Sequence, residues 1–300
     1  MHWFDASAIT RSLPIPYRAY AWYSRVMANR STGIVRGGSF LLSLLIFVTR
    51  SLRLKGEALV PIGNLKVSVD LRDQRMLWVF GELLEPGHES RIMRSSMSEG
   101  DTFLDVGANH GSYSLMAAQV VGPAGRVIAF EPQPRLASLI QRSFEANDLR
   151  HCQVYEVACS DRGGVSDFYI PSAGSGSGGL YERFSANADH RRISVKTSRF
   201  DDAIDWEHLP GRVFVKLDVE GSEFSFLLGA EKMLRCRRPQ ILFEINPISA
   251  EAAGHSVADV LRLLDSLGYA RFAEIDRYPE TTSLRGVDCT RQRNVVALPS

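Results

Sequence analysis

Residues 103–111 read FLDVGANHG, and this stretch decides the fold of the chain. Two apolar residues lead into Asp105 and Val106, and two glycines follow, Gly107 and Gly111, four positions apart. The run predicts a buried strand, a glycine turn and a helix that begins at the turn, where a ligand can reach backbone N–H groups. The spacing differs from the G-x-G-x-x-G of dinucleotide-binding turns, and a carboxylate two residues before the first glycine would repel a pyrophosphate. Asp105 suits a cationic ligand that carries an amino group.

A second carboxylate strengthens this interpretation. A short helix is predicted at 112–121 and an apolar strand at 126–130, which ends at Glu131. An acidic residue about 20 positions past the glycine turn, at the tip of the second strand, can accept hydrogen bonds from both hydroxyls of a ribose. Asp105 and Glu131 together predict a pocket for an adenosine with a positive group, as in S-adenosylmethionine. The alternative is an ordinary βαβ unit with carboxylates at exposed strand ends.

Composition narrows the class of protein. The 300 residues allow one large domain or two small ones. The 35 Lys and Arg residues nearly balance the 34 Asp and Glu residues, which argues against a strongly basic surface, so we expect no nucleic-acid partner. The cysteines form no C-x-x-C pair, so we expect free thiols in a reducing, cytoplasmic compartment rather than zinc or disulfides. They are Cys152, Cys159, Cys236 and Cys289.

A strongly apolar run, FLLSLLIFV at 40–48, is flanked by arginines at both ends of the segment 36–50. It is shorter than the about 20 residues that span a bilayer, and it lies too far from Met1 for a secretory signal. Two interpretations stay open: a buried helix, or an interfacial anchor that gives peripheral membrane contact through residues 36–50. Residues 1–55 are interpreted as a helical N-terminal extension, and residues 56–300 as the main domain.

The pattern of apolar residues alternates between strand and helix from Asp101 onward, which predicts a mostly parallel sheet covered by helices on both faces. Before that point, 59–71 predicts two strands around a turn, and 73–98 predicts a helix interrupted at Pro86-Gly87. Later strands are expected at 153–158, 193–197, 212–217, 241–245, 271–275 and 294–298, and later helices at 134–147, 223–235 and 257–267.

One segment, 171–192, breaks this pattern. It contains SAGSGSGG, then LYERF, then NADHRR, and its low hydrophobicity cannot sustain a packed core. It is interpreted either as a slack linker or as a mobile lid over the substrate. The contacting tip of such a lid would be Tyr181, Glu182, Arg183 and Phe184.

Five runs of the sequence, taken together, resemble the FkbM-type branch of the class I S-adenosylmethionine-dependent methyltransferases. The likeness covers roughly Asp101 to Asn246, and KLDVEGSE followed by RPQILFE is its most specific part. The matching runs are FLDVGANHGSYSL, VIAFEPQP, VACSDRGGVSDFYI, VFVKLDVEGSEFSFLLGA and RPQILFEIN.

The resemblance implies a Rossmann-like α/β fold with a seven-stranded sheet whose last strand is antiparallel, and methyl transfer to an oxygen. The implied partner is a small molecule or glycan, with a hydroxyl on a sugar, glycolipid or secondary metabolite as acceptor. His110 occupies a variable position and is interpreted as a bystander. Implied cofactor contacts are Asp105, Gly107, Asn109 and Gly111 around the methionine, Glu131 at the ribose, and Ala158 and Asp161 near the adenine.

An aliphatic hydroxyl is a poor nucleophile, so the acceptor needs a group that helps to remove its proton. The resemblance places Asp218 opposite the transferred methyl group. If the strand that ends at Asp218 lies between those that end at Asp105 and near Glu244, three carboxylates share one edge of the sheet. Asp218 is the predicted group that orients or deprotonates the acceptor, and Glu244 is the second candidate. Lys216, on the same face as Asp218, is the third catalytic candidate. It needs a carboxylate partner, and its alternative role is a purely structural salt bridge.

A divalent metal is considered at Asp218 and the Glu244/Asn246 pair, which offer hard oxygen ligands. The chain has no D-x-D cluster and Lys216 can relieve the repulsion, so no metal site is predicted. Glu220 is interpreted as a residue that caps the next helix. The alternative functions that stay open are a methyltransferase for RNA or protein, a membrane-associated non-catalytic module and, more distantly, a nicotinamide-dependent oxidoreductase. The sequence makes no prediction of oligomeric state.

Overall fold

The computed structural model describes residues 57–70, 73, 75–84, 86–171, 175–182 and 190–300. The predicted N-terminal extension, including residues 36–50, lies outside the described residues. Within the described ranges, no helix combines the length and apolar character that crossing a bilayer requires.

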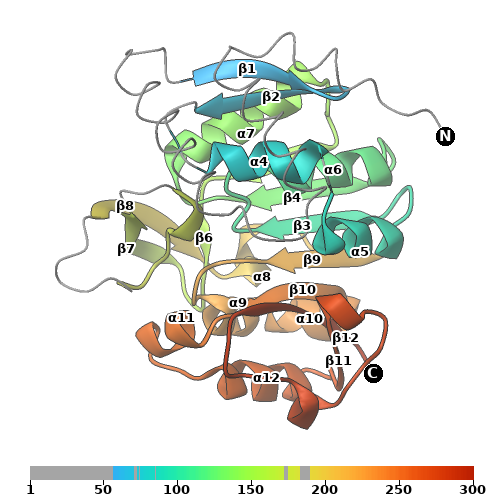
Figure 1. The fold of residues 1–300 in the computed structure, drawn as a ribbon, viewed down its shortest axis with the longest axis vertical. Helices are drawn as coiled ribbons and strands as arrows, with labels where there is room; N and C mark the ends of the chain where they lie inside the picture. Colours follow the sequence, from blue (N-terminus) through green and yellow to red (C-terminus); the bar gives the residue numbers. More distant parts are fainter. Residues whose placement is uncertain (1–56, 71–72, 74, 85, 172–174, 183–189) are drawn as a thin grey trace, which may run out of the picture.

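A seven-stranded sheet forms the centre of the molecule, in the order β11-β12-β10-β9-β3-β4-β5 (Figure 1). Strands β3, β4, β5, β9 and β10 run parallel, whereas β12 pairs antiparallel with both β10 and β11. The predicted Rossmann-like sheet with an antiparallel last strand is therefore confirmed, and β9 lies between β3 and β10 as expected. The bounds are β3 Thr102–Val106, β4 Arg126–Phe130, β5 Cys152–Tyr155, β9 Val213–Leu217, β10 Gln240–Ile245, β11 Arg271–Glu274 and β12 Arg293–Leu298.

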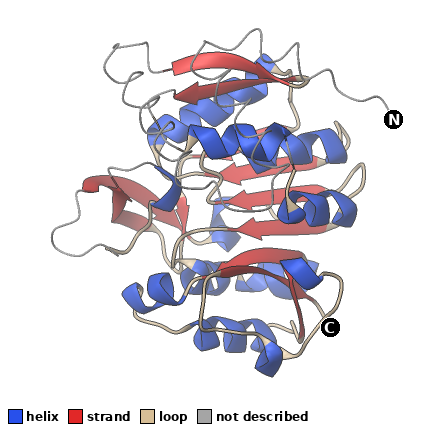
Figure 2. Cartoon of the chain, viewed as in Figure 1, coloured by secondary structure: helices blue, strands red, loops and turns tan. Residues whose placement is uncertain are grey.

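Helices flank this sheet in two layers (Figure 2). On one face, α4 Met76–Leu84, α5 His88–Ser96, α6 Ser112–Val121 and α7 Pro134–Ala146 form one buried cluster with the sheet. On the other face lie α8 Phe200–Ala203, α9 Glu223–Gly229, α10 Glu231–Arg237, α11 Pro247–Ala252 and α12 Val257–Ser266. Side chains alternate between the faces: Phe103 and Phe214 pack on the α6 side, and Leu104 and Val215 on the α9 side.

The helix predicted at 223–235 is divided in the structure at Ala230, between α9 and α10. A Cβ at Gly229 would lie 2.0 Å from the backbone oxygen of Ser160. The chain therefore turns at a point of close backbone approach, which a helical periodicity alone does not reveal.

A two-stranded hairpin, β1 Glu57–Ile62 and β2 Leu65–Asp70, packs on α7. Ser68 N donates to Ser143 Oγ at 2.9 Å, and Lys66 N donates to Asn147 Oδ1 at 2.8 Å. The hairpin predicted at 59–71 is confirmed, as are the two helices on either side of Pro86-Gly87.

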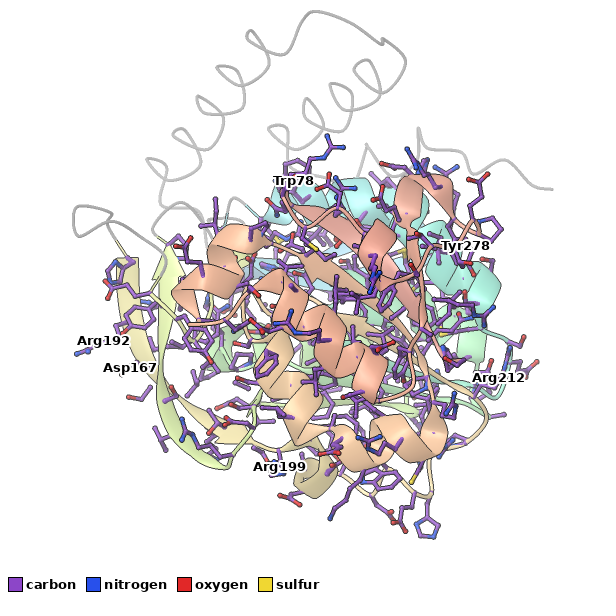
Figure 3. All side chains as sticks on the ribbon, turned by 90° about the horizontal axis from the view of Figure 1, so that it is seen from below. Trp78, Asp167, Arg192, Arg199, Arg212 and Tyr278 are labelled. Atoms are coloured by element: carbon purple, nitrogen blue, oxygen red, sulfur yellow. The ribbon has the colours of Figure 1, made fainter. Side chains whose placement is uncertain are left out.

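A three-stranded sheet, β6-β8-β7, lies beside the carboxyl ends of the central strands (Figure 1). Its strands are β6 Ala158–Cys159, β7 Gly164–Pro171 and β8 His190–Ser198. Residues 190–192, which were predicted to belong to the loop, are thus part of a strand, and β8 is longer than the predicted 193–197. Strands β7 and β8 form a second hairpin. On its outer side, Arg192 Nη1 on β8 lies 3.2 Å from Asp167 Oδ2 on β7 (Figure 3).

Candidate active site

A pocket opens where β3, β4 and β9 end, and the β7–β8 hairpin and the short helix η1 Ser175–Ser177 complete its wall. It encloses about 720 Å³ between protein atoms, counting the part open to solvent. In an open parallel sheet, ligands bind beyond the carboxyl ends of the strands, so the pocket lies where the fold places a ligand.

The glycine turn after β3 lies against the end of β9. Gly107 has φ +83°, and a Cβ there would lie 2.0 Å from the backbone oxygen of Asp218. Gly107 N and Ala108 N both donate to the carbonyl oxygen of Phe130, each at 3.0 Å. Only glycine fits this position, because both the conformation and the backbone contact exclude a side chain.

Asn109 holds the turn to its neighbours. Its backbone N–H donates to Glu131 Oε2 at 2.8 Å, and its side-chain amide donates to the carbonyl oxygen of Ser175 at 3.1 Å. His110 Nδ1 lies 2.6 Å from Asn109 Oδ1, and burial lowers the pKa of His110 to about 4. The neutral ring therefore donates its Nδ1–H to Asn109 Oδ1 and fixes the amide. His110 is not part of the pocket lining that the described residues form, so it acts by positioning Asn109.

Glu131 is the pocket's buried carboxylate. Its Oε1 accepts from Gln133 N at 2.9 Å, and its Oε2 accepts from Asn109 N. Burial raises its pKa to about 8. Two backbone N–H groups fix the orientation of the carboxylate, and each oxygen keeps a further acceptor site, as a ribose diol requires.

Apolar side chains line the pocket beyond Glu131. Phe130, Val157 and Ala158 come from the ends of β4 and β6, whereas Phe168 and Leu180 come from the hairpin and the segment that follows it. These flat and aliphatic surfaces suit a purine ring.

Asp105 lies behind the pocket wall. It is buried under α6, where its Oδ2 accepts from Ser114 Oγ at 2.6 Å, and its Oδ1 has no hydrogen-bond partner among the described residues. Burial raises its pKa, although Lys216 beside it on β9 opposes that shift. Asp105 is the residue before the last one of β3, Val106. Its side chain points to the layer of helices, where Ser114 lies, and not beyond the carboxyl end of the strand.

Lys216 and Asp218 form the opposite side of the pocket. Lys216 Nζ donates to Asp218 Oδ2 at 2.9 Å and lies 4.7 Å from the centre of the Tyr113 ring. Burial disfavours the lysine's charge, but Asp218 and Asp105 outweigh it and raise the pKa of Lys216. Lys216 thus has the carboxylate partner that its position in a buried strand demands, while the Asp218 side chain stays about two-fifths exposed (41%).

An acidic cluster continues from Asp218. The carboxylate oxygens of Asp218, Glu220 and Glu244 lie within 4.8 Å of one another. Burial and the charges of Asp218 and Glu220 raise the pKa of Glu244 to about 7, and Gln292 donates to its Oε1 at 2.5 Å. Such oxygen donors match those that bind Mg²⁺, but Lys216 and protonation of Glu244 also relieve the repulsion. Glu220, predicted to cap a helix, lines the pocket instead.

The turn after β9 is held by Glu223. Its carboxylate accepts from Val219 N at 3.3 Å and from Gly221 N at 3.0 Å, and burial raises its pKa to about 8. Gly221 has φ +103°, and a Cβ there would lie 2.6 Å from the backbone oxygen of Ser249. The sequence VEGSE therefore builds the turn that presents Asp218 and Glu220 to the pocket.

The structure brings most, but not all, of the predicted site residues together. Those that line the pocket are Gly107, Asn109, Glu131, Ala158, Lys216 and Asp218. Those that do not line it among the described residues are Asp105, Gly111, Asp161 and Glu244. Asp161 lines a neighbouring surface hollow, and Gly111 packs on Ile140. Glu244 lies next to the lining residues Asp218 and Glu220 in the acidic cluster. Their roles toward a cofactor or acceptor stay predictions.

Several pocket residues were not predicted. They are Arg75, Ser112, Tyr113, Phe168, Ser175, Leu180 and Ser222. Tyr113 belongs to the run FLDVGANHGSYSL and could have been noticed, whereas Arg75 lies far before the glycine turn and carries no sequence signal. Of the predicted lid tip, Tyr181 contacts Ser225 at 3.2 Å, and Arg183 and Phe184 lie outside the described residues.

The sequence is similar to those of known methyltransferases. A model of the family described as methyltransferase FkbM domain matches residues 105–270, more than half of the chain. A curated protein of Sulfolobus acidocaldarius, named "probable cobalt-precorrin-6B C(15)-methyltransferase (decarboxylating)", is 34% identical over 65 residues, which are 22% of this chain and 34% of that protein. The chain thus spans about a third of the length of that relative.

Two solved structures show a distant likeness. An FkbM methyltransferase of Methylobacillus flagellatus KT is 17% identical with a TM-score of 0.42, over 87% of this chain and 60% of that one. An rRNA methylase of Streptococcus thermophilus is 9% identical with a TM-score of 0.40, over 70% of this chain and 93% of that one.

Proposed function

The chain belongs to the FkbM methyltransferase domain family, and from this membership we propose that it is an S-adenosylmethionine-dependent O-methyltransferase. The proposed acceptor is a hydroxyl of a sugar, glycolipid or secondary metabolite. One observation carries the proposal: Glu131, held by two backbone N–H groups, faces a pocket at the end of the parallel strands.

The pocket residues fit the cofactor. Glu131 offers acceptors for the ribose hydroxyls, and the apolar wall that includes Phe130 and Phe168 suits the adenine. The glycine turn at Gly107 lines the side of the pocket proposed for the methionine portion, and the carboxylates of Asp218 and Glu220 favour a nearby positive charge. When bound, the cofactor supplies an activated methyl group on a sulfonium, which leaves as a neutral thioether.

The chain's own residues handle the proton and the alignment. Asp218 is the proposed base, because it lines the pocket and its side chain remains partly exposed. Lys216 donates to Asp218 Oδ2 and orients the carboxylate, and Asp218 is proposed to accept the proton of the acceptor hydroxyl. Glu244 lies on the neighbouring strand β10 and is proposed to influence Asp218 as a member of the acidic cluster. Holding the hydroxyl and the methyl group in line supplies much of the rate enhancement, because a well-aligned pair avoids about 7–11 kcal/mol of entropic cost.

The proposal extends to the setting of the enzyme. A cytoplasmic protein with peripheral membrane contact through residues 36–50 would meet glycolipid acceptors at the bilayer surface. This part rests on the apolar run and its flanking arginines. Sedimentation with anionic liposomes, compared between the full chain and a chain truncated at Gly56, tests it: only the full chain should sediment.

Two measurements test the activity. Titration calorimetry should give one S-adenosylhomocysteine bound per chain, because the pocket offers a single carboxylate at the position of a ribose. Methyl-labelled S-adenosylmethionine should then transfer label to hydroxylated sugars or glycolipids in a panel that also includes RNA and protein extracts. Absence of cofactor binding would refute the methyltransferase proposal, and label found only in RNA or protein would refute the acceptor class.

A further inference from the structure

Arg75 is a pocket residue that comes from outside the matched family region. It precedes α4, and its backbone N–H donates to Asp73 Oδ1 at 3.0 Å. A Cβ at Gly176 would lie 2.9 Å from Arg75 Cδ, so the segment at η1 packs across the arginine's methylene groups. The side chain, 22% exposed, is therefore fixed along its length, and Arg75 is part of the pocket lining.

Glu82 orients the guanidinium. Arg75 Nη2 donates to Glu82 Oε1 at 2.6 Å, and Ser112 Oγ donates to Glu82 Oε2. One carboxylate thus ties the arginine to the first residue of α6, next to the glycine turn. This bond uses one of the five N–H donors of a guanidinium, which leaves others for a ligand.

The charges in the pocket single out Arg75. Glu131, Asp218 and Glu220 contribute acidic side chains to the pocket lining, and Arg75 and Lys216 contribute the basic ones among the described residues. Lys216 is bonded to Asp218, whereas Arg75 is held at the pocket's edge by Glu82. Among the lining residues that the structure describes, Arg75 alone offers an anionic group of a ligand a planar hydrogen-bonding fork.

We infer that the Arg75 guanidinium binds the carboxylate of the cofactor's methionine portion, an inference that rests on the proposed function. The cofactor has one carboxylate. If Glu131 holds the ribose, the amino-acid end extends past Gly107 and Asn109 toward Ser112 and Arg75. Arg75 would then fix that end of the cofactor and so help to align the sulfonium with the acceptor.

Two ligands and two proteins test the inference by calorimetry. S-adenosylhomocysteine carries the carboxylate, and S-adenosyl-3-thiopropylamine is the same molecule without it. The native protein should bind the first about 10- to 100-fold more tightly, as expected for a charged hydrogen-bonded pair. Arg75→Met should lose this preference and bind both ligands about as tightly as the native protein binds the decarboxylated one.

Controls separate the possible failures. Arg142→Met removes the same charge from a surface pair with Glu57 and should leave both affinities unchanged, and Arg75→Lys, which keeps the charge but lacks the fork, should give an intermediate preference. No preference in the native protein would overturn the inference without requiring any variant to fold, and equal loss for both ligands in an Arg75→Met protein that unfolds in urea like the native protein would overturn it as well. If Arg75→Met keeps the native affinity for S-adenosylhomocysteine but has a reduced kcat/KM for the acceptor, the inference is also overturned, because Arg75 would then bind an anionic group of the acceptor and not of the cofactor. Failure of the native protein to bind either ligand refutes the proposed function instead.

Discussion

The two sides of the pocket hold their acidic groups by different means. On the β3–β4 side, Glu131 is buried, and both of its oxygens accept from backbone N–H groups of turns. On the β9–β10 side, Asp218 and Glu244 are held by side chains, namely Lys216, Gln292 and Asn246. Backbone donors depend on the fold alone, whereas side-chain donors change with each substitution.

This difference suggests a division of work. A backbone-held carboxylate suits a ligand that every member of a fold binds in the same way. A cluster held by side chains can be adjusted for a particular acceptor and for proton transfer. Substitutions on the two sides should therefore separate cofactor binding from the chemical step.

The largest expected effect lies on the β9 side. Asp218→Asn removes the proposed base and should lower kcat about 10²- to 10⁴-fold, the usual contribution of a general base. The dissociation constant of S-adenosylhomocysteine should stay within a few-fold of the native value. Glu244→Gln, which acts through the cluster, is the control and should lower kcat less. A variant Asp218→Asn with native kcat would remove Asp218 from the mechanism.

The contact that joins the two sides gives the next largest effect. Gly107→Ala would place a Cβ 2.0 Å from the backbone oxygen of Asp218 at φ +83°. We expect a loss of about 3 kcal/mol or more in the free energy of unfolding, measured in urea. Gly100→Ala has a similar φ of +86° but no atom within 4 Å, so it reports the conformational cost alone, about 1 kcal/mol. Equal losses in the two variants would mean that the backbone contact is not tight.

The β3–β4 side was the more predictable from sequence. The run that leads to Gly107 and the acid at Glu131 have fixed local spacing, and backbone geometry determines what they do. The predicted third strand at 153–158 instead divides into β5 and β6, because Ala158 pairs with Thr197 in the other sheet. Thr197 belongs to the strand that was predicted at 193–197, but a strand prediction does not say which sheet the strand joins.

The direction of side chains was the part that sequence could not give. Asp105 ends an apolar run, and the sequence did not show that its carboxylate accepts a hydrogen bond from Ser114 on α6 inside the protein; its contact with a ligand stays a prediction. Glu220 was interpreted as a cap, yet Glu223 took the role of holding the turn and left Glu220 at the pocket. Arg75 reaches the site only through packing between α4 and η1, which no local pattern encodes.

A substitution at Glu131 should have the opposite signature to that at Asp218. Above pH 8, where Glu131 is ionised, Glu131→Gln leaves one acceptor oxygen where two are needed, so it should weaken S-adenosylhomocysteine binding about 10- to 100-fold, as for the loss of a hydrogen bond to a charged group. With saturating cofactor, kcat should stay near the native value. Calorimetry and initial rates check this, and a large fall in kcat without a loss of affinity would erase the proposed division between the two sides.

The last expected effect concerns pH and the two carboxylates that hold backbone N–H groups, Glu131 and Glu223. Burial raises the pKa of each from the ordinary 4.5 to about 8. Between these values the folded protein binds more protons than the unfolded chain. Their contribution to stability is therefore full below about pH 4.5 and is lost as the pH rises through 8.

Each of these groups can add a slope of at most about 1.4 kcal/mol per pH unit. Urea unfolding at pH 5.5, 7 and 8.5 should show stability falling with pH, and Glu131→Gln or Glu223→Gln should each flatten the fall. Glu231→Gln, on the exposed side of α10 beside Arg235, is the matched control and should leave the slope unchanged. Stability that rises through this window, or a slope that neither variant alters, would mean that both carboxylates are ionised in the folded protein, and Glu131 would then be as charged as the acidic cluster on the opposite side of the pocket.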